Sequence, residues 1–171
     1  PSGTPPMASS TETDKAAAAV LAAPAALRAG ATVVDYDEYG DRHILRQGTN
    51  TLVCEPDDPN TEGFTAWCYQ EGHVSRVNFE KKVAATSNER AEVFRQRVQA
   101  VEAGKISLPV AGQMQYILSG DSLGTATRRG QVARLPYATS ASTGLPEERS
   151  HDGIWLMQAG TNRAHIMIMR P

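Results

Sequence analysis

The sequence predicts an α+β protein in which an antiparallel β-meander packs with one or two helices, as a single domain with an extended N-terminal arm. Short segments of β-branched and aromatic residues alternate with turn residues over residues 31–70. The links between these segments are too short for the helices that connect parallel strands. Over residues 77–103, apolar residues recur mostly every three or four positions, which is the period of a helix.

Composition places the chain among ordinary single-domain proteins. Its 171 residues suffice for one domain, and 17 basic against 19 acidic side chains give a net charge of −2. Proteins that bind nucleic acids usually carry a clear basic excess, so this balance argues against such a partner. The longest apolar run falls short of the ~20 residues that a membrane-spanning helix requires. We therefore expect no nucleic-acid partner and no transmembrane segment within this sequence.

The N-terminal stretch is expected to be an arm outside the domain. Residues 1–15 are rich in Pro, Ser and Thr and bury little, so we expect an extended tail, followed by a single domain over residues 16–171. The tail also resembles the spacer that follows an export signal. Alanine-rich residues 16–26, interrupted by Pro24, predict one helix or two short ones. We expect this whole segment to dock onto a partner protein. The residues assigned to docking are Pro1, Pro5, Pro6, Met7 and Leu21.

Two hairpins make up the predicted meander. Residues 31–46 have the pattern of a hairpin, with a turn at residues 38–41. The next two strands carry Cys54 and Cys68, on either side of the turn-forming stretch 55–63. Such a hairpin brings the two sulfurs face to face and predicts a disulfide, with two buried free thiols as the alternative. A disulfide indicates a periplasmic or otherwise exported protein.

The helical region 77–103 is expected in two segments that lie across one face of the sheet. On the second segment, Arg90, Arg95 and Arg97 are expected on the solvent-facing side. Strands are then expected at residues 114–118, 131–135, 153–157 and 164–169.

The loop 138–152 contains residue types that a serine hydrolase uses. Ser140 and Ser142 could act as nucleophile, with His151 or His165 as base and Asp152 as the third partner. The loop lacks both the G-x-S-x-G elbow and the S-x-x-K pair, so the hydroxyls are better explained as turn residues. The sequence therefore assigns no catalytic residue.

Metal and cofactor motifs do not emerge from the sequence. The acidic stretch 55–62 offers carboxylates for calcium, but it lacks the D-x-[DN]-x-[DN]-G spacing of a calcium loop. The four histidines are scattered, and no glycine-rich phosphate loop is present. We therefore assign no metal ligand and no cofactor.

Three stretches carry a family resemblance: LRAGATVVDYDEYGDRHILRQGTNTLVC, ATSASTGLP and WLMQAGTNRAHIMI. Together they resemble an uncharacterised family of exported bacterial proteins of unknown function. The resemblance covers roughly residues 24–169. It implies export and a single domain, and it implies no functional residues.

These observations lead to one expected function and one alternative. The chain is expected to be an exported, non-enzymatic accessory or structural subunit. It would dock onto other protein subunits of a larger membrane-associated assembly, such as an electron-transfer or photosynthetic complex, and so lie near a membrane surface through its partners. The alternative is a small periplasmic hydrolase or ligand-binding protein that uses the 138–152 loop.

Overall fold

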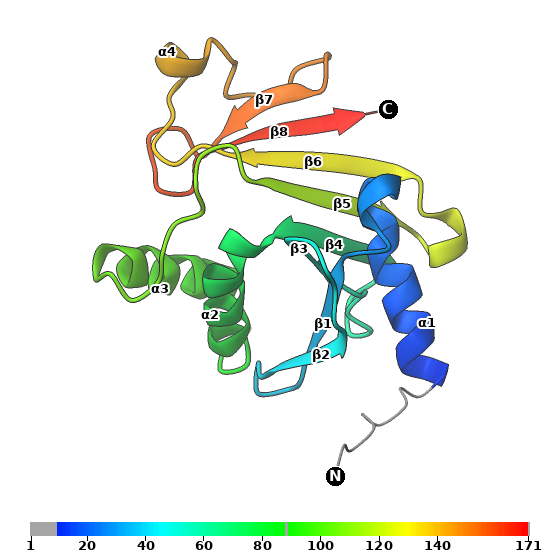
Figure 1. Ribbon diagram of the computed structural model, residues 1–171. Coiled ribbons are helices and arrows are strands. Elements are labelled where there is room, and N and C mark those ends of the chain that lie inside the picture. The colour runs from blue at the N-terminus through cyan, green and yellow to red at the C-terminus, as the bar shows by residue number, and fades with distance from the viewer. Residues whose placement is uncertain (1–9, 88, 171) are drawn as a thin grey trace.

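A computed structural model describes residues 10–87 and 89–170 and confirms the α+β fold (Figure 1). The strands are β1 (Thr32–Tyr36), β2 (Arg42–Arg46), β3 (Leu52–Glu55), β4 (Phe64–Gln70), β5 (Met114–Gly120), β6 (Arg128–Arg134), β7 (Ile154–Met157) and β8 (His165–Arg170). The α-helices are α1 (Ser10–Ala19), α2 (Val74–Ala84), α3 (Arg90–Glu102) and α4 (Ser140–Thr143). Short 3₁₀ turns are η1 (Val20–Ala22), η2 (Ala25–Leu27), η3 (Glu71–His73) and η4 (Leu123–Thr125).

One sheet joins all eight of these strands, in the order β2-β1-β3-β4-β5-β6-β8-β7. Neighbouring strands pair antiparallel except β1 and β3, which pair in parallel. The sheet is therefore mixed, and its first part departs from a purely antiparallel meander. The expected closing pair is present as the antiparallel strands β7 and β8.

The parallel pair arises because the chain leaves β2 and crosses the start of β1 before it enters β3. Gly48 lies at this crossing. A Cβ atom there would lie only 2.4 Å from the Gly30 carbonyl oxygen and 2.4 Å from the Thr32 nitrogen. Glycine allows this close backbone approach because it has no Cβ atom. As a result of the crossing, β3 pairs with β1, and β2 lies at the edge of the sheet.

The two faces of the sheet are covered by different helices, α1 with η1 on one face and α2 with α3 on the other (Figure 1). Side chains alternate between the faces along each strand. In β4, Ala66 and Cys68 belong to the core beneath α1, whereas Trp67 and Tyr69 face the space beneath α2 and α3.

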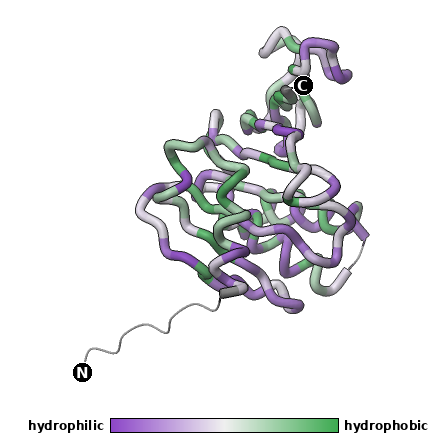
Figure 2. Tube along the Cα trace, turned by 90° about the vertical axis from the view of Figure 1, so that its right-hand side faces the viewer, coloured by the Kyte–Doolittle hydropathy of each residue, from purple (hydrophilic) through white to green (hydrophobic). Residues whose placement is uncertain are grey.

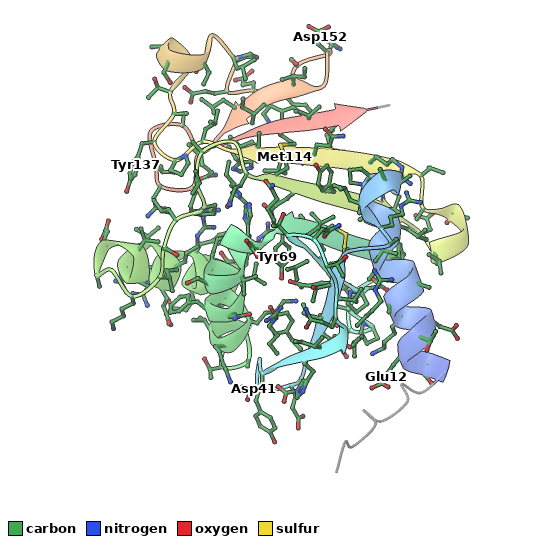
Figure 3. The ribbon with its side chains drawn as sticks, in the orientation of Figure 1. Glu12, Asp41, Tyr69, Met114, Tyr137 and Asp152 are labelled. Atoms are coloured by element: carbon green, nitrogen blue, oxygen red, sulfur yellow. A yellow bond between two sulfur atoms is a disulfide. The ribbon has the colours of Figure 1, made fainter. Side chains whose placement is uncertain are left out.

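The core beneath α1 is apolar and closed. Cys54 and Cys68 lie opposite each other in β3 and β4 and form the predicted disulfide, visible beside α1 in Figure 3. Ala19 and Val33 are also buried there. In Figure 2, hydrophobic stretches gather in the body of the protein. Helix α1 begins at Ser10, within the stretch that the sequence assigns to an extended tail.

Helices α2 and α3 confirm the expected division of the helical region into two segments. The prediction for the α3 arginines is confirmed in part, because Arg90 and Arg95 are exposed. The prediction is wrong for Arg97, which is only 3% exposed. Its helical face also carries Phe94 and points toward the sheet. Composition alone places an arginine on the surface because buried arginines are rare.

Candidate functional site

A cavity of about 410 Å³ lies between the sheet and helices α2 and α3. This volume falls in the range of small-molecule sites. The strands contribute Glu55, Trp67, Tyr69, Gln115, Ile117, Val132, Arg134, Met157, His165 and Met167. The helices contribute Arg76, Val77, Glu80, Lys81, Arg90, Phe94 and Arg97, and the loop between β7 and β8 adds Gln158 and Arg163.

Helical and strand periodicity bring these side chains together from distant parts of the sequence. Arg76 and Glu80 are four residues apart on α2, and Phe94 and Arg97 are three apart on α3. Residues at these spacings share one face of a helix. On the sheet, antiparallel register places Arg134 of β6 opposite His165 of β8.

The lining of the cavity is strongly cationic. Among the described residues that line it, five arginines and one lysine face two glutamates, although the whole chain has a net charge of −2. Positive side chains are therefore concentrated at this one place. Like charges repel, and the repulsion is strong where water is largely excluded.

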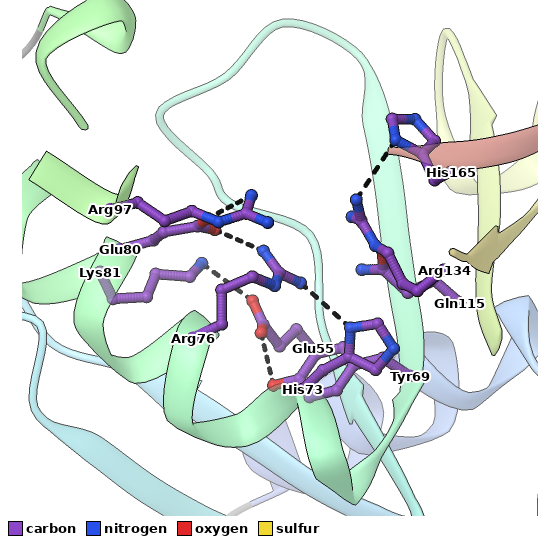
Figure 4. Close-up of polar contacts among 10 residues, drawn as sticks. All are labelled: Glu55, Tyr69, His73, Arg76, Glu80, Lys81, Arg97, Gln115, Arg134 and His165. Atoms are coloured by element: carbon purple, nitrogen blue, oxygen red, sulfur yellow. Dashed lines mark hydrogen bonds and ion pairs between the residues drawn. The ribbon is translucent and has the colours of Figure 1, made fainter. Parts of the chain in front are cut away.

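Glu80 is shared by two buried guanidinium groups (Figure 4). Arg76 Nη1 lies 2.6 Å from Glu80 Oε2, and Arg97 Nη1 lies 3.1 Å from Glu80 Oε1. Arg76 and Arg97 are 6% and 3% exposed. Charges buried this deeply are normally paired one to one. A single carboxylate leaves the pair of arginines with uncompensated positive charge.

Several donors of these two arginines lack hydrogen-bond partners. Within residues 10–87 and 89–170, nothing accepts a hydrogen bond from Arg97 Nε, Arg97 Nη2 or Arg76 Nε. An unsatisfied buried donor costs about 1–3 kcal/mol, and more when it is charged. Nε and Nη2 lie on the same edge of the guanidinium plane. Two parallel N–H groups of this kind suit two oxygens of one carboxylate or phosphate.

Arg134 approaches from the sheet, toward Arg76 and Arg97 (Figure 4). Its Nε and Nη2 donate to the amide oxygen of buried Gln115, and in the described part of the chain no carboxylate pairs with it. Burial, followed by the charges of Arg76 and Arg97, lowers the pKa of Arg134 to about 9. The group still carries its charge at neutral pH.

The remaining contact of Arg134 is weak. His165 Nδ1 lies 3.4 Å from Arg134 Nη1 but 2.8 Å from the carbonyl oxygen of Arg163. A ring nitrogen that donates to this carbonyl cannot also accept from Arg134. The shorter contact therefore leaves Arg134 Nη1 with a donor for another partner.

Two histidines near the arginines are neutral at physiological pH. Burial is the largest cause that lowers the pKa of His73 to about 3 and that of His165 to about 4. Neighbouring arginines, including Arg76 and Arg134, act in the same direction. The histidines thus add no positive charge to the cavity at pH 7.

A cation–π contact and a separate ion pair border other parts of the cavity. Arg163 stacks over the Phe94 ring, with its guanidinium carbon 3.7 Å from the ring centroid. Lys81 Nζ lies 2.9 Å from Glu55 Oε2, and the Tyr69 hydroxyl donates to Glu55 Oε1 at 2.7 Å. Glu55 is thus compensated locally and does not neutralise the arginines around Glu80.

The cysteine prediction is confirmed, since Cys54 and Cys68 form a disulfide and neither is free. The docking residues Pro1, Pro5, Pro6 and Met7 lie outside the described residues. Leu21 is partly buried against the core beneath α1.

The hydroxyls of the 138–152 loop are engaged within the loop itself. Ser140 Oγ donates to Glu147 at 2.8 Å, and Ser142 Oγ donates to the Thr139 carbonyl at 3.0 Å. Ser142 and Thr139 together cap the short helix α4. Within the described residues, neither serine forms a hydrogen bond with a histidine. Of the two candidate bases, His151 and His165, only His165 is among the described residues that line the cavity.

Carboxylates of the acidic stretch are likewise engaged in turns. Asp57 accepts from the Thr65 backbone, and Asp58 accepts from the Asn60 backbone. Over the ranges that the structure describes, no three His, Cys, Asp or Glu residues come together as a metal site. The same ranges contain no helix with the length and hydropathy to cross a bilayer.

The sequence does not predict the cluster formed by Arg76, Arg97 and Arg134. Its only local signals are the spacing of Arg76 with Glu80 and of Arg90 with Phe94 and Arg97. Both spacings are also common on solvent-exposed helices, where opposite charges form surface pairs. The convergence of α2 and α3 with β6 depends on tertiary structure that these spacings do not encode.

Comparison with protein-family models, with curated proteins and with solved structures gave no match to this chain.

Proposed function

We propose that the protein binds a small organic anion in the cavity between the sheet and helices α2 and α3. The observation that carries the proposal is Arg97, which is 3% exposed and whose Nε and Nη2 donors have no partner among the described residues. An anion supplies both the missing acceptors and the missing negative charge. The cavity provides the volume for a ligand of this kind.

A binding function also explains why the protein contains an arrangement that is unfavourable without a ligand. Arginines that share one carboxylate reduce the stability of the free protein, because their desolvation is only partly compensated. Functional sites commonly retain such unfavourable features, since the ligand relieves them. The proposal places this activity in an exported protein, which is compatible with the disulfide. A periplasmic location is part of the proposal.

Thermal unfolding with inorganic phosphate as the probe tests the proposal. At phosphate concentrations tenfold above Kd, binding to the folded state raises the free energy of unfolding by about 1.4 kcal/mol. We expect this stabilisation in the wild type and its loss in Arg97→Gln. The matched control is Arg95→Gln, which removes the same charge from the exposed side of α3 and should respond like the wild type. Sodium chloride at equal ionic strength controls for screening.

Two results would refute anion binding in the cavity. One is a wild-type protein that phosphate does not stabilise beyond the chloride control and that shows no heat of binding in calorimetric titration. The other is equal stabilisation of the wild type and Arg97→Gln, which would place any bound phosphate elsewhere.

An accessory role in a larger assembly is a second proposal. One observation favours it: all three apolar residues of η2 (Ala25–Leu27) are exposed, and Leu27 is 38% exposed. This turn lies at the end of the segment that the sequence assigns to docking, which runs to residue 26. Gel filtration of solubilised envelopes from the source cells tests the role. We expect the wild type in a high-mass fraction and Leu27→Ser mainly as free chain, whereas equal retention would exclude η2 as the contact.

A further inference from the structure

The structure also indicates which anion the cavity would accept. This inference rests on the proposed binding function and deepens it. We propose that the ligand is a small phosphate monoester whose doubly charged head lies among Arg76, Arg97 and Arg134 and whose body is flat and apolar.

The charge of the head follows from the groups that would surround it. Arg76, Arg97 and Arg134 converge on one region, and Glu80 is the carboxylate paired with the first two (Figure 4). These groups leave an excess of two positive charges. A phosphate monoester carries a charge of about −1.5 to −2 at pH 7, whereas a carboxylate carries only −1. A dianion therefore matches the excess more closely.

The shape of the head follows from where the donors originate. Arg76 comes from α2, Arg97 from α3 and Arg134 from β6 on the opposite side of the cavity. Donors on separate elements reach an anion from several directions. A tetrahedral phosphate presents oxygens in several directions, whereas a carboxylate presents both of its oxygens in one plane. The arrangement favours the tetrahedral group.

The apolar body follows from the floor of the cavity. Trp67 of β4 lies opposite Ile117 of β5, and Val132 of β6 lies opposite Met167 of β8. These four side chains line the same cavity as the arginines, and Phe94 lines it from α3. An inorganic anion would leave this surface uncovered. Burying a ring against it would add affinity through the hydrophobic effect.

Calorimetric titration of the full chain with phenyl phosphate, inorganic phosphate and benzoate tests the proposal. We expect phenyl phosphate to bind about tenfold tighter than inorganic phosphate, because its ring covers the apolar floor. We also expect it to bind about tenfold tighter than benzoate, because its head carries the additional charge.

Two variants test which residues bind the phosphate head and which contact the apolar body of the ligand. Arg134→Gln should weaken both phosphates about tenfold, whereas Arg129→Gln removes the same charge from an exposed position of the same strand and should bind like the wild type. Trp67→Ala should weaken phenyl phosphate about tenfold and leave inorganic phosphate within about twofold. Trp67 is 37% exposed, so this substitution leaves the core beneath α1 intact.

The outcomes separate this proposal from the more general one. Equal affinities for phenyl phosphate and inorganic phosphate would overturn the apolar body, and tighter binding of benzoate would overturn the phosphate head. In both cases anion binding itself would stand. If none of the three probes binds, the proposed function fails together with the ligand class.

Discussion

The two faces of the sheet differ in chemistry, although the same strands form both. Beneath α1, buried residues such as Leu52 and Leu118 form an apolar core around a disulfide. Beneath α2 and α3, the strands carry Arg134 and Gln115 opposite helices that supply further arginines. One face is closed and chemically satisfied, whereas the other encloses a cavity with unpaired donors. We therefore propose that the α1 face supplies most of the stability and that the α2/α3 face binds the ligand.

The largest effect is expected from the α1 face. Replacing both cysteines in Cys54→Ala/Cys68→Ala removes a cross-link that closes a short loop, which should lower the free energy of unfolding by about 3 kcal/mol. Urea unfolding under non-reducing conditions measures this loss, and thiol titration of the denatured wild type should find no free thiol. Phosphate binding should change little. A large loss of phosphate affinity in the folded variant would contradict the separation of the two faces.

Glu80→Gln tests the α2/α3 face by removing negative charge from the arginines. The substitution removes the carboxylate that Arg76 and Arg97 share. Because buried positive charge is then left without a partner, we expect a loss of about 2 kcal/mol in the free energy of unfolding. Added phosphate should stabilise this variant at least as much as the wild type. The comparison uses chemical unfolding with and without phosphate, and a variant that phosphate does not stabilise would contradict the proposed site.

The buried histidine predicts how stability depends on pH. Burial, together with the charges of Arg76, Arg134 and Arg97, lowers the pKa of His73 from 6.5 to about 3 in the folded protein. The unfolded chain therefore takes up a proton first as the pH falls. This contribution to stability is present above the unfolded pKa and is lost on acidification toward the folded pKa. The slope approaches about 1.4 kcal/mol per pH unit for one proton.

Urea unfolding between about pH 7 and about pH 4.5 measures this slope. We expect His73→Gln to show a shallower slope than the wild type over this interval. The control His151→Gln changes an exposed histidine and should keep the wild-type slope. Equal slopes in all three proteins would show that burial and the neighbouring arginines do not suppress protonation of His73.

Sequence reasoning anticipates the α1 face better than the other face. Cys54 and Cys68 could be paired because each lies in an apolar strand and a turn separates them. That inference uses local pattern and short-range connection alone. The parallel pairing of β1 and β3 escaped it, because the crossing at Gly48 depends on a close backbone approach that no periodicity reveals.

The sequence does not predict the buried arginines of the α2/α3 face, and the reason is physical. Arg97 lies in a helix whose charged residues resemble a solvent-exposed side, and composition favours that interpretation. Its burial follows from its place beside Glu80 of α2, on a cavity that β6 and β8 also line, and all of these elements lie apart from α3 in the sequence. The residues that break the usual rule for buried charges are therefore the ones that mark the site.

Equilibrium unfolding of Arg97→Met beside the wild type, each with and without inorganic phosphate, tests the central claim most directly. Replacing a partly unsatisfied buried charge by an apolar side chain should raise the free energy of unfolding by about 1 kcal/mol without phosphate. Phosphate should then stabilise the wild type and the control Arg95→Met but leave Arg97→Met unchanged. The contrary result is an Arg97→Met protein that is less stable than the wild type and that phosphate still stabilises. It would contradict the claim that Arg97 lowers the stability of the free protein and binds the anion.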